Sequence, residues 1–315
     1  MIAPVCKHTE STKNGKSKAG LQRFKCKSCG VGFTEENFHD GPLGKMRVDV
    51  DKAMIVISML LEGMSIRACE RITGMNRDTI DRLILEVGDK CQNFHDYNVQ
   101  NVACSDLQLD EIWSFVGMKA RKAKNQDDAT QGDSWTYIAL DRETKLIAAH
   151  HVGGRTGEET NIFLAKLRRA IDTSQRFQVS TDGWGAYKYG VPFNLGGNVD
   201  FGQLVKKYAS QQTTTRYSPA VIISAEKRPR FGNPDHDRIC TSHVESLNQK
   251  IRMHLRRFTR LTNAHSKSLK HHEAMQAIFF AWYNFCRLHL ALGKQTPAMA
   301  AGIVNRKLEL VDLLG

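Results

Sequence analysis

Apolar residues recur at helical spacing between positions 50 and 88, in three pieces broken near Gly63 and Gly74. The pattern predicts a helix-turn-helix. The apolar positions expected on its inner faces are Ile57, Leu60, Leu61, Ile66, Ile72, Met75, Ile80, Leu83, Ile84 and Val87. Because the second helix of this motif enters the DNA major groove, the residues expected to face DNA are Asn76, Arg77, Asp78, Thr79 and Arg82. Glu70 departs from the motif, since a small residue is usual where the two helices touch. A three-helix spacer is the alternative.

From Ser105 onward the pattern changes to strand, strand, strand, helix and strand. The predicted strands cover 105–117, 134–141, 145–153 and 176–184. The predicted helix covers 158–171 and places on broadly one side Ile162, Leu164, Leu167 and Ile171. Between Lys119 and Asp133 the chain is charged and poor in apolar residues, which favours a hairpin tip.

A basic segment follows, and it contains a further helix at 243–258. An apolar stripe of this helix is formed by Val244, Leu247, Ile251, Leu255 and Phe258, and a neighbouring face by Glu245, Asn248, Arg252 and Arg256. We expect the first face to pack and the second to meet substrate. A later apolar helix at 272–289 closes the domain, and a turn with a short helix follows it.

Composition narrows the class of protein. The 315 residues are 41% hydrophobic, with a formal net charge of +12 and a pI near 9.3. Because cationic surface attracts polyanions, nucleic acid is the leading partner, with a basic enzyme or a membrane-surface protein as alternatives. No apolar stretch reaches the roughly 18 residues that span a bilayer, and the start does not resemble a signal peptide. We expect a protein that is neither secreted nor membrane-bound.

The eight cysteines do not form the dense pattern of a small disulfide-bonded domain, which favours a reducing compartment. Cys26 and Cys29 are a close pair and lie with Cys6 around a Lys- and Gly-rich hairpin. Two thiolates separated by two residues can bind one tetrahedral zinc ion. A matching first pair would need a cysteine where Thr9 stands, so His8 is the candidate for the missing ligand. The alternative is a ribbon that no longer binds metal.

Two aspartates end predicted strands, in "LDEIW" and "STDGW", and one glutamate lies on the basic helix. Two divalent ions about 4 Å apart can carry out phosphodiester chemistry, and hard magnesium ions take carboxylate oxygens as ligands. The acids that meet this description are Asp110, Asp182 and Glu245. The competing acids are Asp106, Glu111 and Asp141. Because surface acids at strand ends are common, the pattern alone leaves the assignment open.

The order of these motifs resembles that of the transposases of the insertion-sequence-one family, over almost the entire chain. "CKSCGVGFT" resembles the family's zinc ribbon, and "GMSIRACERITGMNRDTI" its helix-turn-helix. "LDEIWSFVGMKARK", "WTYIALDRETKLIAAHHVGGRT" and "TDGWGAY" resemble the catalytic half, and "HVESLNQKIRMHLRRFTRLTNAHSKS" the segment that carries the glutamate. Each piece alone is weak evidence, whereas their shared order is specific.

The resemblance implies an α/β fold, with a ribonuclease H-like mixed sheet flanked by helices and preceded by a small zinc ribbon and a helical helix-turn-helix domain. The expected domains are a ribbon at 1–40, a helix-turn-helix at 41–98, a catalytic domain at 99–300 and a tail at 301–315. The implied activity is that of a DDE transposase whose acidic triad binds two Mg²⁺ or Mn²⁺ ions; that triad is Asp110, Asp182 and Glu245. The expected zinc ligands are Cys6, His8, Cys26 and Cys29.

The implied reaction cuts a phosphodiester at each transposon end, and the released 3′ hydroxyl then attacks target DNA. The N-terminal modules are expected to bind the terminal inverted repeats. Because two ends must be held together, we expect a homodimer or a larger synaptic assembly. Arg252 falls where such enzymes place a basic residue against DNA, and Asn248 and His243 are candidate supporting residues. Arg256 completes the expected DNA-binding set.

Other functions stay open from the sequence. The first is a non-catalytic DNA-binding regulator descended from a transposase, although the presence of all three acids disfavours it. The second is a metal-dependent nuclease without strand transfer. The third takes the acids as solvated charges on a basic structural protein.

Overall fold

The computed structural model describes residues 8–17, 20–34, 42–44, 46–119, 130–208, 222–259 and 262–315. The chain divides into two compact units, Met1–Ala53 and Met54–Gly315, which are described separately below. Most of the expected hairpin tip between Lys119 and Asp133 lies outside the described residues, and so does Cys6. The finer division into four domains stays a prediction.

The first unit contains an antiparallel sheet in the order β1–β2–β3. Its strands are β1 (Ser11–Lys16), β2 (Gln22–Cys26) and β3 (Gly32–Thr34). Phe24 and Phe33 lie opposite each other on β2 and β3, with ring centroids 5.5 Å apart, and both are buried together with Cys26. Such a small core normally needs further stabilisation, and a bound metal ion is one way to obtain it.

Three helices follow, with breaks where Gly63 and Gly74 predict them. They are α1 (Val50–Leu61), α2 (Ile66–Thr73) and α3 (Arg77–Asn98). The Ser65 hydroxyl caps α2 by accepting the N–H of Ala68 at 3.2 Å, and Gly74 ends this helix in the left-handed region at φ 67°. Most of the predicted inner positions are buried, but Ile72 is 64% exposed. The prediction for Ile72 is wrong, because the packed face of α2 is centred on Cys69.

The centre of the second unit is a mixed sheet in the order β6–β5–β4–β7–β8–β9. Three strands form an antiparallel meander, β7 and β8 continue parallel to β4, and β9 returns antiparallel. The strands are β4 (Asp106–Val116), β5 (Gly132–Asp141), β6 (Ile147–Gly153), β7 (Phe177–Asp182), β8 (Val199–Tyr208) and β9 (Ile222–Phe231). This arrangement confirms the expected ribonuclease H-like sheet.

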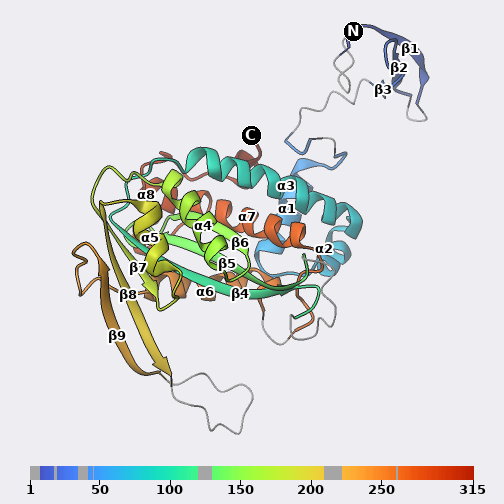
Figure 1. Cartoon of the computed structure of the whole chain (residues 1–315). Helices are drawn as coiled ribbons and strands as arrows, with labels where there is room; N and C mark the ends of the chain where they lie inside the picture. The colour runs from blue at the N-terminus through green and yellow to red at the C-terminus, as the bar shows by residue number, and fades with distance from the viewer. Residues whose placement is uncertain are drawn as a thin grey trace. The chain divides into compact units, whose positions relative to one another are not determined.

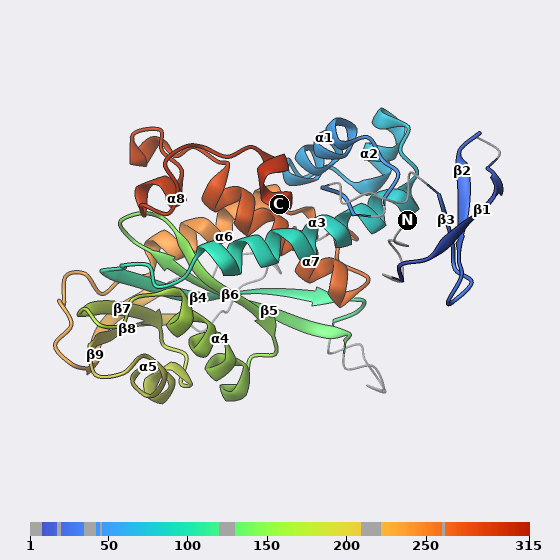
Figure 2. The same ribbon diagram turned by 90° about the horizontal axis from the view of Figure 1, so that it is seen from above.

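Helices cover both faces of the sheet (Figures 1 and 2): α4 and α5 lie on one face, and α3, α6 and α7 on the other. The remaining helices are α4 (Gly157–Ala170), α5 (Tyr187–Leu195), α6 (Ser242–His254), α7 (Leu269–Phe285), α8 (Pro297–Ala300) and the short 3₁₀ turns η3 (Arg256–Phe258), η4 (Leu290–Leu292) and η5 (Leu310–Leu314). Helix α7 is buried along most of its length and packs on α3. Within the described residues, no helix is long and apolar enough to cross a bilayer.

The predicted strands between 105 and 184 and the predicted helices after them are confirmed. On α4 the prediction for Ile162 is wrong: this residue is 41% exposed, and Phe163 is buried instead. The packed side of α4 is set by Phe163, Leu164 and Leu167, a spacing that turns Ile162 outward. The sequence pattern did not predict α5, β8 or β9.

Candidate active site

Asp110 and Asp182 lie side by side because their strands are parallel neighbours. Leu109 on β4 pairs with Thr181 on β7, so the next residue along each strand is an aspartate. Ligand oxygens of Asp110, Glu111 and Asp182 all lie within 4.8 Å of one another. The structure therefore brings together the two aspartates of the expected triad and adds Glu111, which the sequence left as a competing acid.

Negative charge is crowded in this cluster and shielded from water. The pKa of Asp110 is raised to about 7, first by burial and then by the charges of Asp182 and Glu111, with a smaller effect of Glu245. Burial and the charge of Asp182 likewise raise the pKa of Glu111 to about 7. A divalent cation would relieve this repulsion, so the cluster is electrostatically suited to bind one.

Helix α6 brings Glu245 and Asn248 to the cluster. Asn248 donates from Nδ2 to Oδ2 of Asp110 at 2.8 Å. Glu245 lies close enough for its charge to act on Asp110. Its Oε1 accepts a hydrogen bond from the Thr241 hydroxyl at 2.6 Å and forms an ion pair with the ammonium of Lys206 on β8. The third acid of the expected triad therefore interacts with the charge of Asp110 but is not one of the acids whose oxygens lie within 4.8 Å of one another, and its own carboxylate pairs with a lysine.

A buried glutamine fixes the start of α6 relative to β4. Oε1 of Gln108 accepts the backbone N–H groups of His243 at 2.9 Å and Val244 at 3.2 Å. The first N–H groups of a helix have no partner within it, and Gln108 supplies one. Gln108 and Asp110 are two residues apart and so point to the same face of β4. Sequence patterning offered no signal for this role, because the partners are distant along the chain.

Arg155, which the sequence analysis missed, lies between the acids and two tryptophans. Its guanidinium pairs with Glu111 at 3.0 Å and with Asp182 at 3.4 Å. The same group lies over the rings of Trp135 and Trp184, 4.7 and 4.5 Å from their centroids. Two carboxylates and two aromatic faces together hold the guanidinium in one place. Its only sequence signal is an arginine just after a predicted strand, in "GGRTGEE", which is too common to single out.

The other predicted acids lie elsewhere. Asp106, at the start of β4, is buried and pairs with Arg142 at 3.2 Å and Arg238 at 2.9 Å. Asp141 accepts hydrogen bonds within the turn between β5 and β6. The ring of His243 faces a lysine of that same turn, with its Nδ1 3.4 Å from the ammonium. We therefore place none of these three side chains in the carboxylate cluster.

The residues expected to face DNA lie at the start of α3. Arg77 and Arg82 are exposed and Thr79 is half-buried. The side chain of Asn76 caps the helix, because its Oδ1 accepts a backbone N–H of the first turn at 2.8 Å. Oε1 of Glu70 accepts the N–H of Arg77 at 3.1 Å. This bond gives a physical reason for a glutamate at the position where a small residue is usual.

The two arginines expected to face DNA near the end of α6 differ in environment. Arg252 is half-buried, and its Nη1 donates to the carbonyl of Phe258 at 3.4 Å. Arg256, the first residue of η3, is exposed. Of the two, Arg256 is the more accessible to a ligand.

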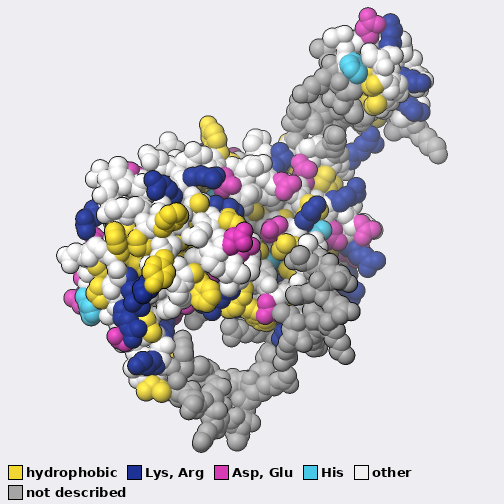
Figure 3. Space-filling view, in the orientation of Figure 1, with side chains coloured by type: hydrophobic (Ala, Val, Ile, Leu, Met, Phe, Trp, Pro, Cys, Tyr) yellow, Lys and Arg dark blue, Asp and Glu magenta, His cyan; other side chains and the backbone are white. Residues whose placement is uncertain are grey.

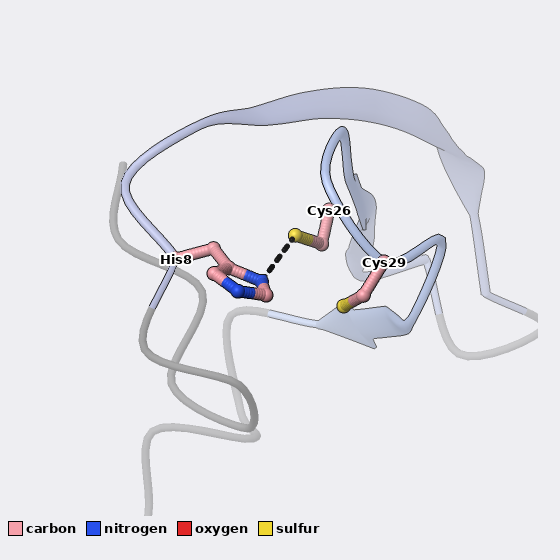
Figure 4. Close-up of side chains that lie close together, drawn as sticks. All are labelled: His8, Cys26 and Cys29. Carbon is pink, nitrogen blue, oxygen red and sulfur yellow. Dashed lines mark hydrogen bonds between the residues drawn. The ribbon is translucent and has the colours of Figure 1, made fainter.

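Three of the expected zinc ligands converge in the first unit (Figure 4). Ligand atoms of His8, Cys26 and Cys29 lie within 4.8 Å of one another, and Nδ1 of His8 is 3.6 Å from Sγ of Cys26. Cys26 is buried and Cys29 is exposed. Two thiolates and an imidazole are donors that zinc prefers, and they supply three of the four corners of a tetrahedron. The fourth expected ligand, Cys6, is not among the described residues.

The donors in the second unit suit a different metal. Carboxylates offer only oxygen, the ligand that Mg²⁺ and Mn²⁺ prefer. Beside them, Oδ1 of Asn248 is buried and has no hydrogen-bond partner within the described part of the chain. A buried oxygen of this kind is costly unless something donates to it or coordinates it. The residues present therefore fit a hard divalent cation.

Comparison with known proteins matches part of the second unit to one family. Residues 101–207 match the family described as IS1 transposase. The chain is 31% identical over 90 residues to the insertion element IS1 protein InsB of Shigella flexneri, a match that covers 28% of this chain and 53% of the relative. It is 25% identical over 175 residues to the insertion element IS1 2 protein InsB of Escherichia coli (strain K12), covering 55% of this chain and 70% of the relative.

The matched segment spans about half the length of the Shigella relative. Among solved structures, a piggyBac transposase synaptic complex with hairpin DNA is similar with a TM-score of 0.44 and 11% identity, over 85% of this chain and 70% of that chain. The fold assignment rests on the strand order and not on this likeness. The family match contains both Asp110 and Asp182. Together, the family match and the curated relatives show that residues 101–207 of this chain are similar to the IS1 transposase family.

Proposed function

We propose that this chain is a DDE transposase that cuts DNA at the ends of an insertion sequence and joins those ends to target DNA. The observation that carries the proposal is the position of Asp110 and Asp182 at adjacent points of two parallel strands, with Glu245 on α6 close enough for its charge to act on Asp110. In a transposase, a cluster of acids that repel one another in a water-poor site is suited to phosphodiester transfer.

In this proposal Asp110, Asp182 and Glu245 hold two Mg²⁺ or Mn²⁺ ions. When bound, such ions activate the attacking oxygen and stabilise the leaving oxygen of the phosphodiester. The protein's own contribution is to keep the carboxylates in place. Asn248 orients Asp110, while the backbone N–H of Trp184 donates to Oδ1 of Asp182 at 2.9 Å. Positions fixed before DNA binds reduce the reorganisation that the reaction requires.

The distribution of positive charge supports DNA as the substrate. In Figure 3, Lys and Arg side chains gather over β8 and β9, the two strands beyond β7. The basic residues of these strands are Lys206, Lys207, Lys227, Arg228 and Arg230. In this proposal the start of α3 and the zinc ribbon bind the terminal inverted repeats, and a homodimer or larger assembly holds two ends together.

The decisive experiment compares Asp182→Asn with Asp89→Asn in the full chain, using DNA that carries the inverted repeats flanking its reading frame. Asp89 is an exposed aspartate on α3, so its variant is a matched control. We expect Asp182→Asn to slow Mg²⁺-dependent cleavage at least about a thousandfold, because several kcal/mol of metal stabilisation are lost. Binding of the repeats should stay unchanged in both variants.

Two outcomes would favour other functions. If the wild-type protein binds the repeats but never cuts them, and Asp182→Asn keeps its cellular effect, the chain is a regulator. If the wild-type protein cuts but fails to join precut ends to a target plasmid, it is a nuclease. Joining of precut ends that requires both Asp182 and Mg²⁺ supports the transposase.

A further inference from the structure

A basic groove lies between the start of α2 and the segment that follows α6. Its volume is about 760 Å³, and all of its lining residues belong to the second unit. The charged or titratable side chains in the lining are Arg67, Arg256, Arg257, Lys267 and His265. Among the described residues that line the groove, none is acidic. A concave surface lined with one sign of charge attracts ligands of the opposite sign.

Three of these cations are available to a ligand, and one is not. Arg257 is used by the protein itself: its guanidinium donates to Ser266 and to a backbone carbonyl, and burial lowers its pKa to about 10. Arg67, Arg256 and Lys267 are exposed. Within the described residues, none of these three forms an ion pair with an acid. Lys267 contacts the ring of His265, which is itself a neighbour in the lining.

The groove has a defined position relative to the carboxylate cluster, because α6 connects them. Glu245 lies in the first turn of α6, and Arg256 comes two residues after its last residue, His254. The nine helical steps from Glu245 to His254, at 1.5 Å per residue, span about 14 Å. The end of α6 touches the turn between α1 and α2. Nδ1 of His254 lies 2.8 Å from the carbonyl of Leu61, and a Cβ placed on Gly63 would lie 3.1 Å from the carbonyl of Met253.

We propose that this groove binds the sugar–phosphate backbone of the double-stranded DNA end, with Arg67, Arg256 and Lys267 as phosphate contacts. The inference rests on the proposed function and adds to it a path for the DNA between α2 and the acids. Contacts to phosphate carry no sequence information but fix the register of a protein on the duplex. At about 3.4 Å per nucleotide along one strand, a separation of about 14 Å places the contacted phosphates about four nucleotides from the cleaved bond.

The salt dependence of DNA binding tests this proposal. The double variant Arg67→Gln/Arg256→Gln is compared with Arg169→Gln/Lys294→Gln, which removes the same charge from exposed residues of α4 and of the turn before α8. Each lost phosphate contact should reduce the slope of log K against log salt by about 0.9. We therefore expect a reduction of about 1.8 for the groove variant and none for the control. Arg67→Lys/Arg256→Lys keeps both charges and should retain the wild-type slope.

A second measurement locates the contacts. Ethylation of DNA phosphates should interfere with wild-type binding about four nucleotides from the cleavage site, and this interference should disappear with Arg256→Gln. If the salt slope of the groove variant is unchanged, or falls equally in the control, the groove does not bind DNA phosphates. In that case joining of precut ends would still occur, and the proposed function would stand. Failure of the wild-type protein to cut or join any end would instead remove the proposed function itself.

Discussion

Arg155 compensates negative charge that β4 buries at Glu111. The Glu111 side chain is 1% exposed and that of Arg155 is 32% exposed, so the acid depends on this cation for a partner. Removing one member of a buried pair leaves an uncompensated charge, whereas removing both members costs much less. The measured effect of a substitution at Arg155 therefore depends on whether Glu111 is ionised.

We expect Arg155→Gln to lower the free energy of unfolding of the metal-free protein by about 3 kcal/mol at pH 8. At this pH Glu111, with its pKa raised to about 7, is mostly ionised. Glu111→Gln/Arg155→Gln should recover more than half of the loss, which urea denaturation of the four proteins of this cycle measures. Arg155→Lys keeps the charge but loses the planar guanidinium that lies over the rings of Trp135 and Trp184, so its free energy of unfolding should fall between those of the wild-type protein and Arg155→Gln. Losses that simply add in the double variant would contradict charge compensation.

His272 makes a separate prediction about pH. It is fully buried, with Nε2 3.0 Å from the Ser114 hydroxyl and Nδ1 2.9 Å from that of Ser266. Burial, and next the charge of Arg257, lower its pKa to about 3. The unfolded chain, with a histidine pKa near 6.5, therefore takes up the proton first as the pH falls. The stabilisation from neutral His272 is complete above pH 6.5 and is lost progressively as the pH falls toward 3.

We expect His272→Gln to make unfolding less sensitive to acid. Between pH 6 and 5, the free energy of unfolding of the wild-type protein should lose about 1.4 kcal/mol per pH unit more than that of the variant. Urea titrations at several pH values give both slopes. His236→Gln removes an exposed histidine and should keep the wild-type slope. Equal slopes for His272→Gln and the wild-type protein would show that His272 does not resist protonation.

At the scale of elements, the geometry of the acids depends on how α6 is attached to β4. Gln108→Leu would leave two N–H groups at the start of α6 without their acceptor, at a cost of about 1–3 kcal/mol. We expect cleavage to fall about 10- to 100-fold, as for the loss of a residue that orients a metal ligand. Binding of the repeats should change little, because α3 is unaffected. Cleavage and gel-shift assays at equal protein concentration measure the two effects.

A neighbouring glutamine provides the control for Gln108. Gln178 on β7 is also buried; its Oε1 accepts the N–H of Asp235 at 2.8 Å and its Nε2 donates to the carbonyl of the same residue at 3.2 Å. Gln178→Leu should therefore lose similar stability while retaining more of the cleavage activity. If both variants lose cleavage equally, the effect of Gln108 reflects stability and not the position of α6.

The elements that the sequence pattern predicts well are those with a regular apolar period and clear ends. The helix-turn-helix has glycines at its breaks and a serine cap, and β4 and β5 are rich in β-branched and aromatic residues. The elements that it misses lack such a signal. Helix α5 contains Pro192, and β9 is a largely exposed edge strand with the charged sequence "AEKRPR". Exposed edge strands are specified by pairing with a neighbour more than by their own period.

At the scale of the whole molecule, the carboxylate cluster joins residues that are distant in sequence. The pattern places both aspartates at strand ends, which is right for Asp182 and wrong for Asp110, because β4 continues to Val116. It does not state that β7 lies next to β4. That adjacency follows from the strand order, which the resemblance to a family implied and which periodicity alone does not encode. The same limit applies to Arg155 and Gln108, whose roles exist only through partners on other elements.

The division into two units leads to the last prediction, which concerns metal in the first unit. The buried cluster of its β-sheet consists of Phe24, Cys26 and Phe33, and Cys26 is also one of the zinc ligands we propose. Purified full-length protein should contain about one zinc ion per chain, measured by a colorimetric chelator after unfolding. Cys29→Ser should lose the ion and weaken binding of the terminal repeats.

Because the second unit has its own core, its main thermal transition and the Mg²⁺-dependent joining of precut ends at high DNA concentration should persist. Cys240→Ser, a thiol of the second unit, should keep the zinc. A zinc-free wild-type protein that binds the repeats with full affinity would show that the ribbon works without metal.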